Sequence, residues 1–185
     1  MVHLEAKDGW HRHPFTISSA PRDGVVQITV KALGDYTSQL QHLVEPGMPA
    51  VIEGPHGRFR HTRGTSRQVW IAGGVGVAPF LSWLRGLEDA LPQHVDFFYS
   101  NDGPAPFSEE IERIAEHFPT LRVHIFDTSV QGRVTVANIL NAAGEPKGLS
   151  VFMCGPRGMV RALQADLRRA GVPGARIHRE YFDWR

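Results

Sequence analysis

One glycine-rich turn constrains the fold of this chain more than any other feature. Apolar residues 69–72 run into the turn Gly-Gly-Val-Gly-Val-Ala-Pro over residues 73–79, and a segment with helical apolar periodicity follows. Glycine permits tight turns and close approach of a ligand. Pro79 suits the first turn of a helix, where its missing N–H is not needed. The pattern predicts a strand, a turn and a helix whose first N–H groups favour a phosphate. The alternative is a glycine-rich turn that binds nothing, because the motif alone is weakly specific.

A second turn of the same kind lies later in the chain. Residues 150–153 form a short apolar run, and Cys154-Gly155-Pro156 then opens a further helical segment. Two such turns indicate one nucleotide crevice with the Cys154 thiol inside it. The alternative for Cys154 is an inert buried thiol, since free cysteines are usually buried.

Strands and helices alternate from residue 67 onward. Strands are predicted at residues 69–72, 95–99, 122–126, 150–153 and 176–181, with helices between them. This alternation indicates an α/β fold with a doubly wound, five-stranded parallel sheet. Ligands of such sheets bind at the carboxyl ends of the strands, where both turns lie. The first third reads instead as β-rich, with strands at 15–19, 25–30 and 50–53 and a helix at 37–44.

The composition excludes several classes of function. The formal net charge of +1 gives no case for nucleic-acid binding. One cysteine allows neither an internal disulfide nor an iron–sulfur cluster held by four thiolates of this chain. The ten histidines are scattered, and no metal site is predicted. No apolar run approaches the roughly 20 residues of a membrane span. One basic segment is either a solvated connection between domains or a surface facing anionic lipid or an acidic partner. Its arginines are Arg58, Arg60, Arg63 and Arg67.

Six motifs follow one another along nearly the whole chain. They are residues 13–21 (HPFTISSAP), 34–37 (GDYT), 54–57 (GPHG), 73–79 (GGVGVAP), 154–156 (CGP) and 180–182 (EYF). In this order they resemble the ferredoxin–NADP reductase superfamily. Within it, they are most similar to the dehydrogenase domains of bacterial ferric reductases and NADPH oxidases.

The resemblance implies an FAD site in the first third of the chain. In the family's flavin motif an aromatic ring packs on the isoalloxazine and a hydroxyl bonds its edge. The residues that match it are His13, Pro14, Phe15, Thr16 and Ser18. Lys31 and Thr37 match positions that hold the FAD pyrophosphate, which a cation and a hydroxyl donor suit. Phe15 is otherwise a core residue, and Thr37 is otherwise a helix cap.

The resemblance also implies a nicotinamide dinucleotide site. The two glycine turns supply its pyrophosphate contacts through Gly73, Gly74, Gly76, Pro79, Gly155 and Pro156. Cys154 and Glu180 match polar groups beside the point of hydride transfer. Phe182 resembles the C-terminal aromatic that covers the flavin until nicotinamide displaces it. Trp184 shares its strand face and is the rival for that role; a packed strand end is the alternative to both.

One loop bears on the choice between NADPH and NADH. In relatives that prefer NADP, basic and hydroxyl-bearing residues after the third strand of the sheet bind the 2′-phosphate. Thr128, Ser129 and Arg133 stand in that loop and suit a phosphate. Asp127 suits a free ribose hydroxyl instead. On balance the loop favours NADPH.

The resemblance further implies a domain organisation. The family's flavin domain is a six-stranded antiparallel barrel, but only twelve residues precede His13. We therefore expect a partial FAD-binding β-barrel over residues 1–63, truncated at its N-terminal side, with weak flavin retention. An NAD(P)-binding domain with a flavin-covering C-terminal tail is expected over residues 64–185.

The activity implied is hydride transfer from NAD(P)H to FAD, followed by electron transfer to an acceptor. In the most similar relatives the acceptor is a transmembrane haem-binding domain that reduces ferric iron or oxygen. This would set the present chain on the cytoplasmic face of the membrane. Two alternatives stay open: a soluble flavin reductase that serves a separate acceptor protein, and a non-catalytic nucleotide-binding module that regulates a partner.

Overall fold

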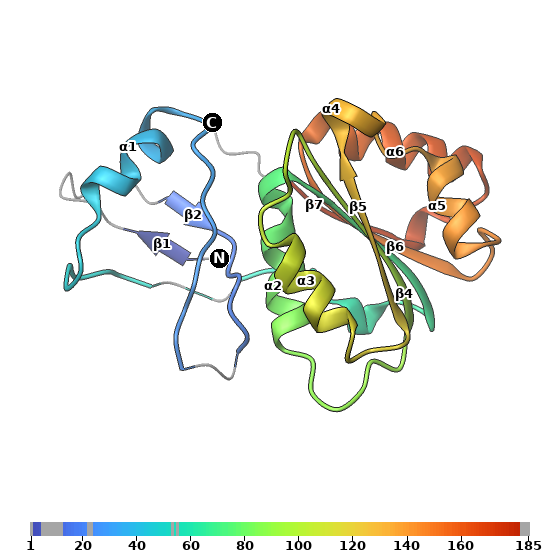
Figure 1. The fold of residues 1–185 in the computed structure, drawn as a ribbon, viewed down its shortest axis with the longest axis horizontal. Helices are drawn as coiled ribbons and strands as arrows, with labels where there is room; N and C mark the ends of the chain where they lie inside the picture. Colours follow the sequence, from blue (N-terminus) through green and yellow to red (C-terminus); the bar gives the residue numbers. More distant parts are fainter. Residues whose placement is uncertain (1, 5–12, 22–23, 53, 55, 182–185) are drawn as a thin grey trace.

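A parallel sheet of five strands forms the larger part of the molecule (Figure 1). The computed structural model describes residues 2–4, 13–21, 24–52, 54 and 56–181. In it the strands lie in the order β5-β4-β3-β6-β7, and each neighbouring pair is parallel. Their bounds are Arg67–Gly73 (β3), His94–Asn101 (β4), Leu121–Asp127 (β5), Leu149–Gly155 (β6) and Ile177–Tyr181 (β7). The predicted sheet and its five strands are confirmed.

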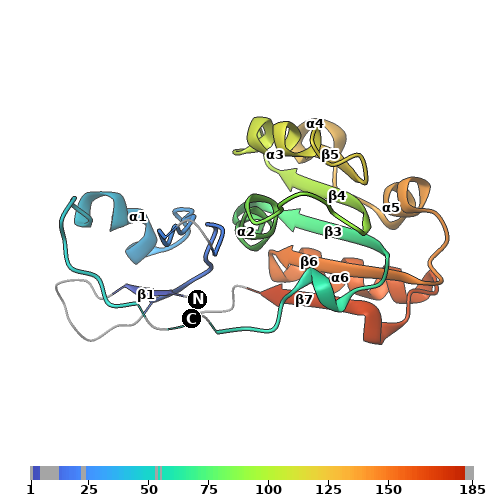
Figure 2. The ribbon, with the colours of Figure 1, turned by 90° about the horizontal axis from the view of Figure 1, so that it is seen from below.

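Helices cover both faces of this sheet (Figure 2). On one face lie α2 (Ala78–Arg85) and α3 (Ser108–Ala115), and on the other lie α5 (Val136–Ala143) and α6 (Arg157–Arg169). Shorter turns are η1 (His61–Arg63), η2 (Gly74–Val77), α4 (Thr128–Gln131) and η3 (Gly174–Arg176). Gly171 follows α6 with φ +99°, a left-handed conformation that favours glycine just after a helix. Each helix layer buries its own apolar cluster, as a doubly wound fold requires.

An aromatic cluster fixes α2 on the sheet. Trp70 of β3 is fully buried, and its ring lies 5.1 Å from that of Trp83 and 6.1 Å from that of Phe80, both on α2. The indole Nε1 donates to Gln68 Oε1 at 2.9 Å, so the buried polar atom is satisfied. Because α2 begins at the glycine-rich turn, this packing holds that turn against the end of β3.

The first third of the chain is organised differently. Strands β1 (Val2–Leu4) and β2 (His13–Phe15) pair antiparallel, Ile17 forms a single bridge with Ile28, and α1 spans Asp35–Leu43. The strands predicted at 25–30 and 50–53 are wrong for their described residues: the first is reduced to the bridge, and residues 50–52 are irregular.

Missing pairing explains this difference between prediction and structure. Several apolar side chains of this part are largely exposed: Val25 at 59%, Leu33 at 72%, Val51 at 57% and Ile52 at 55%. Alternating apolar residues form strands only where a neighbouring strand and a covering layer are present. Among the described residues 14–60, the buried apolar side chains are Ala20 and Leu40, so no such layer exists here.

Candidate functional site

The two glycine turns pack directly against each other at the carboxyl edge of the sheet. β3 and β6 are neighbours, with Ala72 paired to Cys154. A Cβ on Gly76 would lie 2.7 Å from Gly155 Cα and closer still to the Cys154 carbonyl. A Cβ on Gly155 would lie 3.0 Å from the Gly73 nitrogen. These glycines let the two turns touch, so the turns lie together at one edge of the sheet. Pro79, buried in the first turn of α2, and Pro156, the exposed N-cap of α6, flank this contact.

Gly74 differs from Gly73 and Gly76 because a Cβ on it would meet only the tips of two side chains, at ordinary contact distance. Its φ is +53°, and the nearest atoms to a Cβ built on it are Asn101 Oδ1 and Lys31 Nζ, both at 3.9 Å. The backbone N–H groups of η2 therefore lie beside an exposed ammonium group. An N–H turn with an adjacent cation suits the charge of a pyrophosphate. The charge of the turn at Gly74 therefore suits a pyrophosphate group, and Lys31, from the first third of the chain, lies beside this turn of the sheet.

Cys154 and Glu180 lie side by side on adjacent strands, as partners in the β6–β7 register. Cys154 is fully buried, and burial, reinforced by the Glu180 carboxylate, raises the pKa of its thiol well above the ordinary value. Burial also raises the pKa of Glu180. The thiol therefore keeps its proton at neutral pH, and its full burial matches the alternative stated for Cys154, whereas Glu180 is the partly exposed member of the pair. Phe182 and Trp184 lie outside the described residues.

Asp127 organises the loop predicted to meet the adenosine ribose. Its Oδ1 accepts hydrogen bonds from Ser129 Oγ at 2.5 Å, Ser129 N at 2.9 Å and Gly103 N at 3.1 Å. The Ser129 hydrogen bonds are the main cause of a lowered pKa of Asp127, which is charged at neutral pH. Ser129 thus directs its donors at Asp127. Thr128 is half-buried and Arg133 is exposed, so both remain at the loop surface.

The flavin motif divides into accessible and buried residues. Pro14, Phe15 and Thr16 are half-buried, and Lys31 is exposed, so these groups can reach a bound flavin and its phosphates. His13 lies in β2 beside them. Ser18 is buried, and its hydroxyl accepts from Thr29 Oγ1 at 3.0 Å. Contact between this hydroxyl and a cofactor, as the motif implies, does not fit the structure.

Thr37 is a capping residue in this structure. Its Oγ1 accepts from Leu33 N at 3.0 Å and Gly34 N at 3.1 Å, and donates to Gly34 O at 3.2 Å. These hydrogen bonds close the first turn of α1, which is the alternative role stated for this residue. The part of the site that fits FAD is therefore the surface around Phe15, Thr16 and Lys31.

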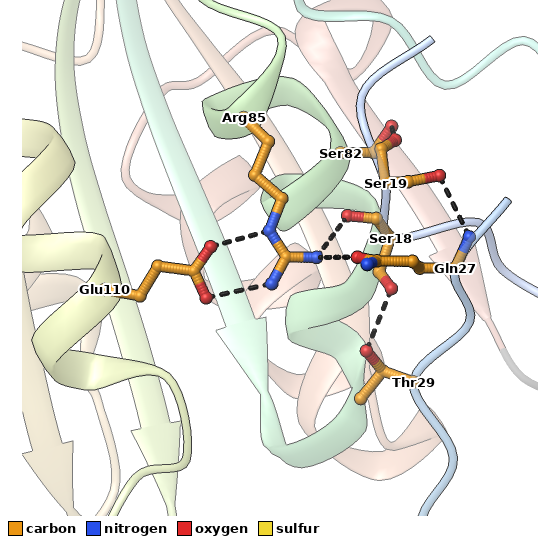
Figure 3. Close-up of polar contacts among 7 residues, drawn as sticks. All are labelled: Ser18, Ser19, Gln27, Thr29, Ser82, Arg85 and Glu110. Carbon is orange, nitrogen blue, oxygen red and sulfur yellow. Dashed lines mark hydrogen bonds and ion pairs between the residues drawn. The ribbon is translucent and has the colours of Figure 1, made fainter. Parts of the chain in front are cut away.

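Sequence reasoning missed one polar cluster between the flavin motif and the sheet. Arg85, at the end of α2, contacts Glu110 of α3 and the backbone of Ser18 (Figure 3). Ser82 of α2 donates to Ser19 O at 2.8 Å. An arginine in the last turn of one helix and a glutamate in the first turn of another each interact favourably with the dipole of their own helix, so both are common at these positions. The sequence therefore holds no signal that distinguishes this pair.

The part of the chain that the structure describes contains no cluster of metal-ligating side chains and no membrane-spanning helix. Within it, no three histidine, cysteine or acidic side chains lie together in a way that could hold a metal ion. None of its helices combines the length and the apolar character needed to cross a bilayer.

Sequence comparisons place the chain among reductases. The pattern of a family described as "FAD-binding domain" matches residues 1–161. The carnitine monooxygenase reductase subunit of Escherichia coli is 25% identical over 187 residues, which cover 98% of this chain and 57% of that protein. The ferredoxin reductase component of the Rhodococcus rhodochrous 3-ketosteroid-9-alpha-monooxygenase is 29% identical over 175 residues, which cover 91% and 50% respectively. The chain spans about half the length of the curated relatives it matches.

Solved structures share the fold. The FAD/NAD binding domain of nitric oxide dioxygenase from Vibrio cholerae superposes with a TM-score of 0.80 at 22% identity, covering 98% of this chain and 82% of that one. A ferredoxin NADP+ reductase from Neisseria gonorrhoeae with bound FAD and NADP gives 0.79 at 18% identity, covering 97% and 84%. The family match extends over most of the chain, and the sheet and its two turns are those expected of a dinucleotide-binding half. The chain therefore belongs to the family described as FAD-binding domain, and it shares its fold with solved FAD- and NAD(P)-binding proteins.

Proposed function

We propose that this chain is the reductase part of an electron-transfer system and oxidises NAD(P)H through FAD. The observation that carries the proposal is the pairing of Cys154 with Glu180 at the sheet edge where both glycine turns end. A regulatory nucleotide-binding module would need the turns but not a protonated thiol beside a carboxyl group. We assign residues 1–63 to the flavin part and residues 64–185 to the nicotinamide part.

When bound, FAD supplies the redox chemistry by accepting a hydride and passing electrons on singly. The chain's own residues bind the two cofactors and orient them for hydride transfer. The N–H groups at Gly74 hold the pyrophosphate of the nicotinamide dinucleotide, and the Lys31 ammonium holds the pyrophosphate of FAD. Cys154 and Glu180 form the edge against which the nicotinamide ring is aligned. Phe15 and Thr16 hold the flavin ring and its edge.

We further propose that NADH is the preferred dinucleotide. The composition of the loop after β5 favours NADPH, but its hydrogen bonds support the opposite choice. Ser129 gives its donors to Asp127. In the proposed binding mode, the charged carboxylate of Asp127 faces the ribose 2′ position. Like charges repel, whereas a carboxylate accepts the hydrogen bond of a free ribose hydroxyl.

The electron acceptor follows from two different resemblances. The relatives named above are reductase components of monooxygenases, which supports a separate oxygenase or ferredoxin protein as acceptor. The sequence motifs support the transmembrane haem domain of a ferric reductase or NADPH oxidase, on the cytoplasmic face of the membrane. We propose a protein-bound one-electron centre in either case. Mixing the reduced, FAD-loaded chain with each class of acceptor protein distinguishes them.

The hydride-transfer role is tested with variants of the paired residues. Cys154→Ala and Glu180→Gln should slow flavin reduction by NADH about 5- to 150-fold while leaving NADH affinity nearly unchanged, because they misalign the reacting atoms. Arg169→Ala, on the surface of α6, serves as the control. Weaker binding with an unchanged reduction rate would contradict the assigned role.

A further inference from the structure

One arginine joins the flavin motif to the dinucleotide-binding sheet. Arg85 Nε and Nη2 donate to the two carboxylate oxygens of Glu110 at 2.6 and 2.8 Å. Its Nη1 donates to Ser18 O at 2.8 Å and to Gln27 Oε1 at 3.2 Å (Figure 3). Only 20% of the arginine side chain is exposed. The guanidinium group therefore bridges α2, α3 and two segments of the first third of the chain.

The sheet side of this bridge is rigid. The bidentate geometry with Glu110 fixes the plane of the guanidinium group. Hydrogen bonds from Arg85 lower the pKa of Glu110, so the partner stays charged at neutral pH. The Phe107 ring lies 5.9 Å from the guanidinium carbon, within the range of a cation–π contact. Phe107 is the one non-glycine residue with positive φ, at 70°, among the described residues, and this left-handed conformation places it just before α3.

The flavin side of the bridge is the end of the flavin motif. Ser18 lies two residues after Thr16 and donates its N–H to Gln27 O at 2.8 Å. One helical turn earlier on α2, Ser82 Oγ donates to Ser19 O at 2.8 Å. Two side chains at i and i+3 on one helix face thus hold two consecutive carbonyls. Helix α2 begins at the glycine turn, so this one short helix connects the dinucleotide turn with the flavin motif.

We propose that Arg85 is a positioning residue that sets the placement of the flavin motif relative to the nicotinamide site. Its kinetic consequence rests on the function proposed above. The first third buries few apolar side chains of its own, so these polar contacts with α2 decide where the motif lies. Glu110 acts through Arg85, and Ser82 supports the same segment.

The test compares Arg85→Ala, Arg85→Lys and Glu110→Gln with Arg169→Ala, which removes an exposed arginine paired with Asp166 on α6. Hydrogen–deuterium exchange is measured on the complete 185-residue chain without cofactors. In Arg85→Ala, exchange at residues 16–21 and 24–30 should rise about tenfold or more, the equivalent of one charged hydrogen bond. Strands β3, β4 and β6 should stay protected, and Arg169→Ala should resemble the parent. Arg85→Lys and Glu110→Gln, which keep part of the contact, should give intermediate exchange.

The second readout is flavin reduction in the FAD-loaded chain. At saturating NADH the rate should fall between about 10- and 100-fold in Arg85→Ala, with the NADH dissociation constant unchanged, and recover in part in Arg85→Lys. Unchanged exchange at residues 16–30, or equal loss of protection in the sheet, would overturn the proposal. So would a loss of affinity with an unchanged rate. If the parent chain does not reduce flavin at all, the proposed function fails, while the exchange experiment still decides whether Arg85 holds the motif.

Discussion

Gly74 and Gly76 are only two residues apart, yet they are glycines for different physical reasons. The space beside Gly76 is filled by the β6 backbone, whereas Gly74 has a left-handed φ and only side-chain tips of Asn101 and Lys31 near it. The sequence motif predicts both as contacts of a pyrophosphate. The structure explains Gly76 by the close approach of two strand ends, and the contact with a pyrophosphate stays a proposal for Gly74.

A pair of alanine substitutions separates these roles. Gly76→Ala overpacks the contact with Cys154, so the free energy of unfolding should fall by about 1–3 kcal/mol. Gly74→Ala should lower it by about 1–2 kcal/mol, the cost of a left-handed alanine. It should also weaken NADH binding roughly tenfold, equivalent to about 1.4 kcal/mol. Urea unfolding and calorimetric titration measure the two effects. If Gly74→Ala binds NADH as tightly as the parent, the pyrophosphate does not approach there.

Asp127 provides a second test at the residue scale. Asp127→Asn removes the charge but keeps a side-chain oxygen that accepts from Ser129. NADPH affinity should therefore rise severalfold, because repulsion of the 2′-phosphate is lost, while NADH affinity should fall slightly. Asp89→Asn, on the exposed connection after α2, is the control for a change of net charge. An unchanged ratio of NADPH to NADH affinity would show that Asp127 does not face the ribose.

At the scale of elements, the sequence predicted the sheet well because the sheet is built from local patterns. The central strands β3 and β6 contain short apolar runs, the turns between elements carry glycine or proline, and the ends of β3 and β6 meet because parallel strands share a carboxyl edge. The strands expected at 25–30 and 50–53 did not form, because an apolar pattern favours a strand only where a neighbouring strand is present to pair with it. The Arg85–Glu110 contact joins residues 25 positions apart, and no local pattern encodes it.

Contacts between elements should make the fold sensitive to acid. Asp96 of β4 is buried, which by itself raises the pKa of its carboxyl. Hydrogen bonds from His124 and Arg122 of β5 outweigh this and leave the pKa lowered. A carboxyl whose pKa is lower in the folded chain stabilises the fold above its ordinary pKa, near 4. This stabilisation is lost as the pH falls through the folded value. Asp96→Asn should therefore flatten the decline of unfolding free energy between neutral and acidic pH, as measured by urea unfolding. An equally steep decline in Asp96→Asn would contradict this.

At the scale of the whole molecule, a well-packed sheet lies beside a first third of different architecture (Figure 1). Several apolar side chains of that first third are exposed. In the proposed function these unlike parts have different ligands: a flavin for the first third and a nicotinamide dinucleotide for the sheet. What joins them is α2, with a glycine turn at its start and Arg85 and Ser82 toward its end. The proposed hydride transfer therefore requires that the two cofactors meet beside α2 and the Cys154–Glu180 pair.

The most direct test of that claim is anaerobic mixing of the FAD-loaded chain with NADH deuterated at the transferred hydrogen of nicotinamide C4. If hydride passes from NADH to FAD in this chain, flavin absorbance is lost in a single turnover and the deuterated cofactor reacts more slowly than NADH. That result would place the hydride transfer within this chain. Binding of both cofactors without any loss of flavin absorbance would contradict it.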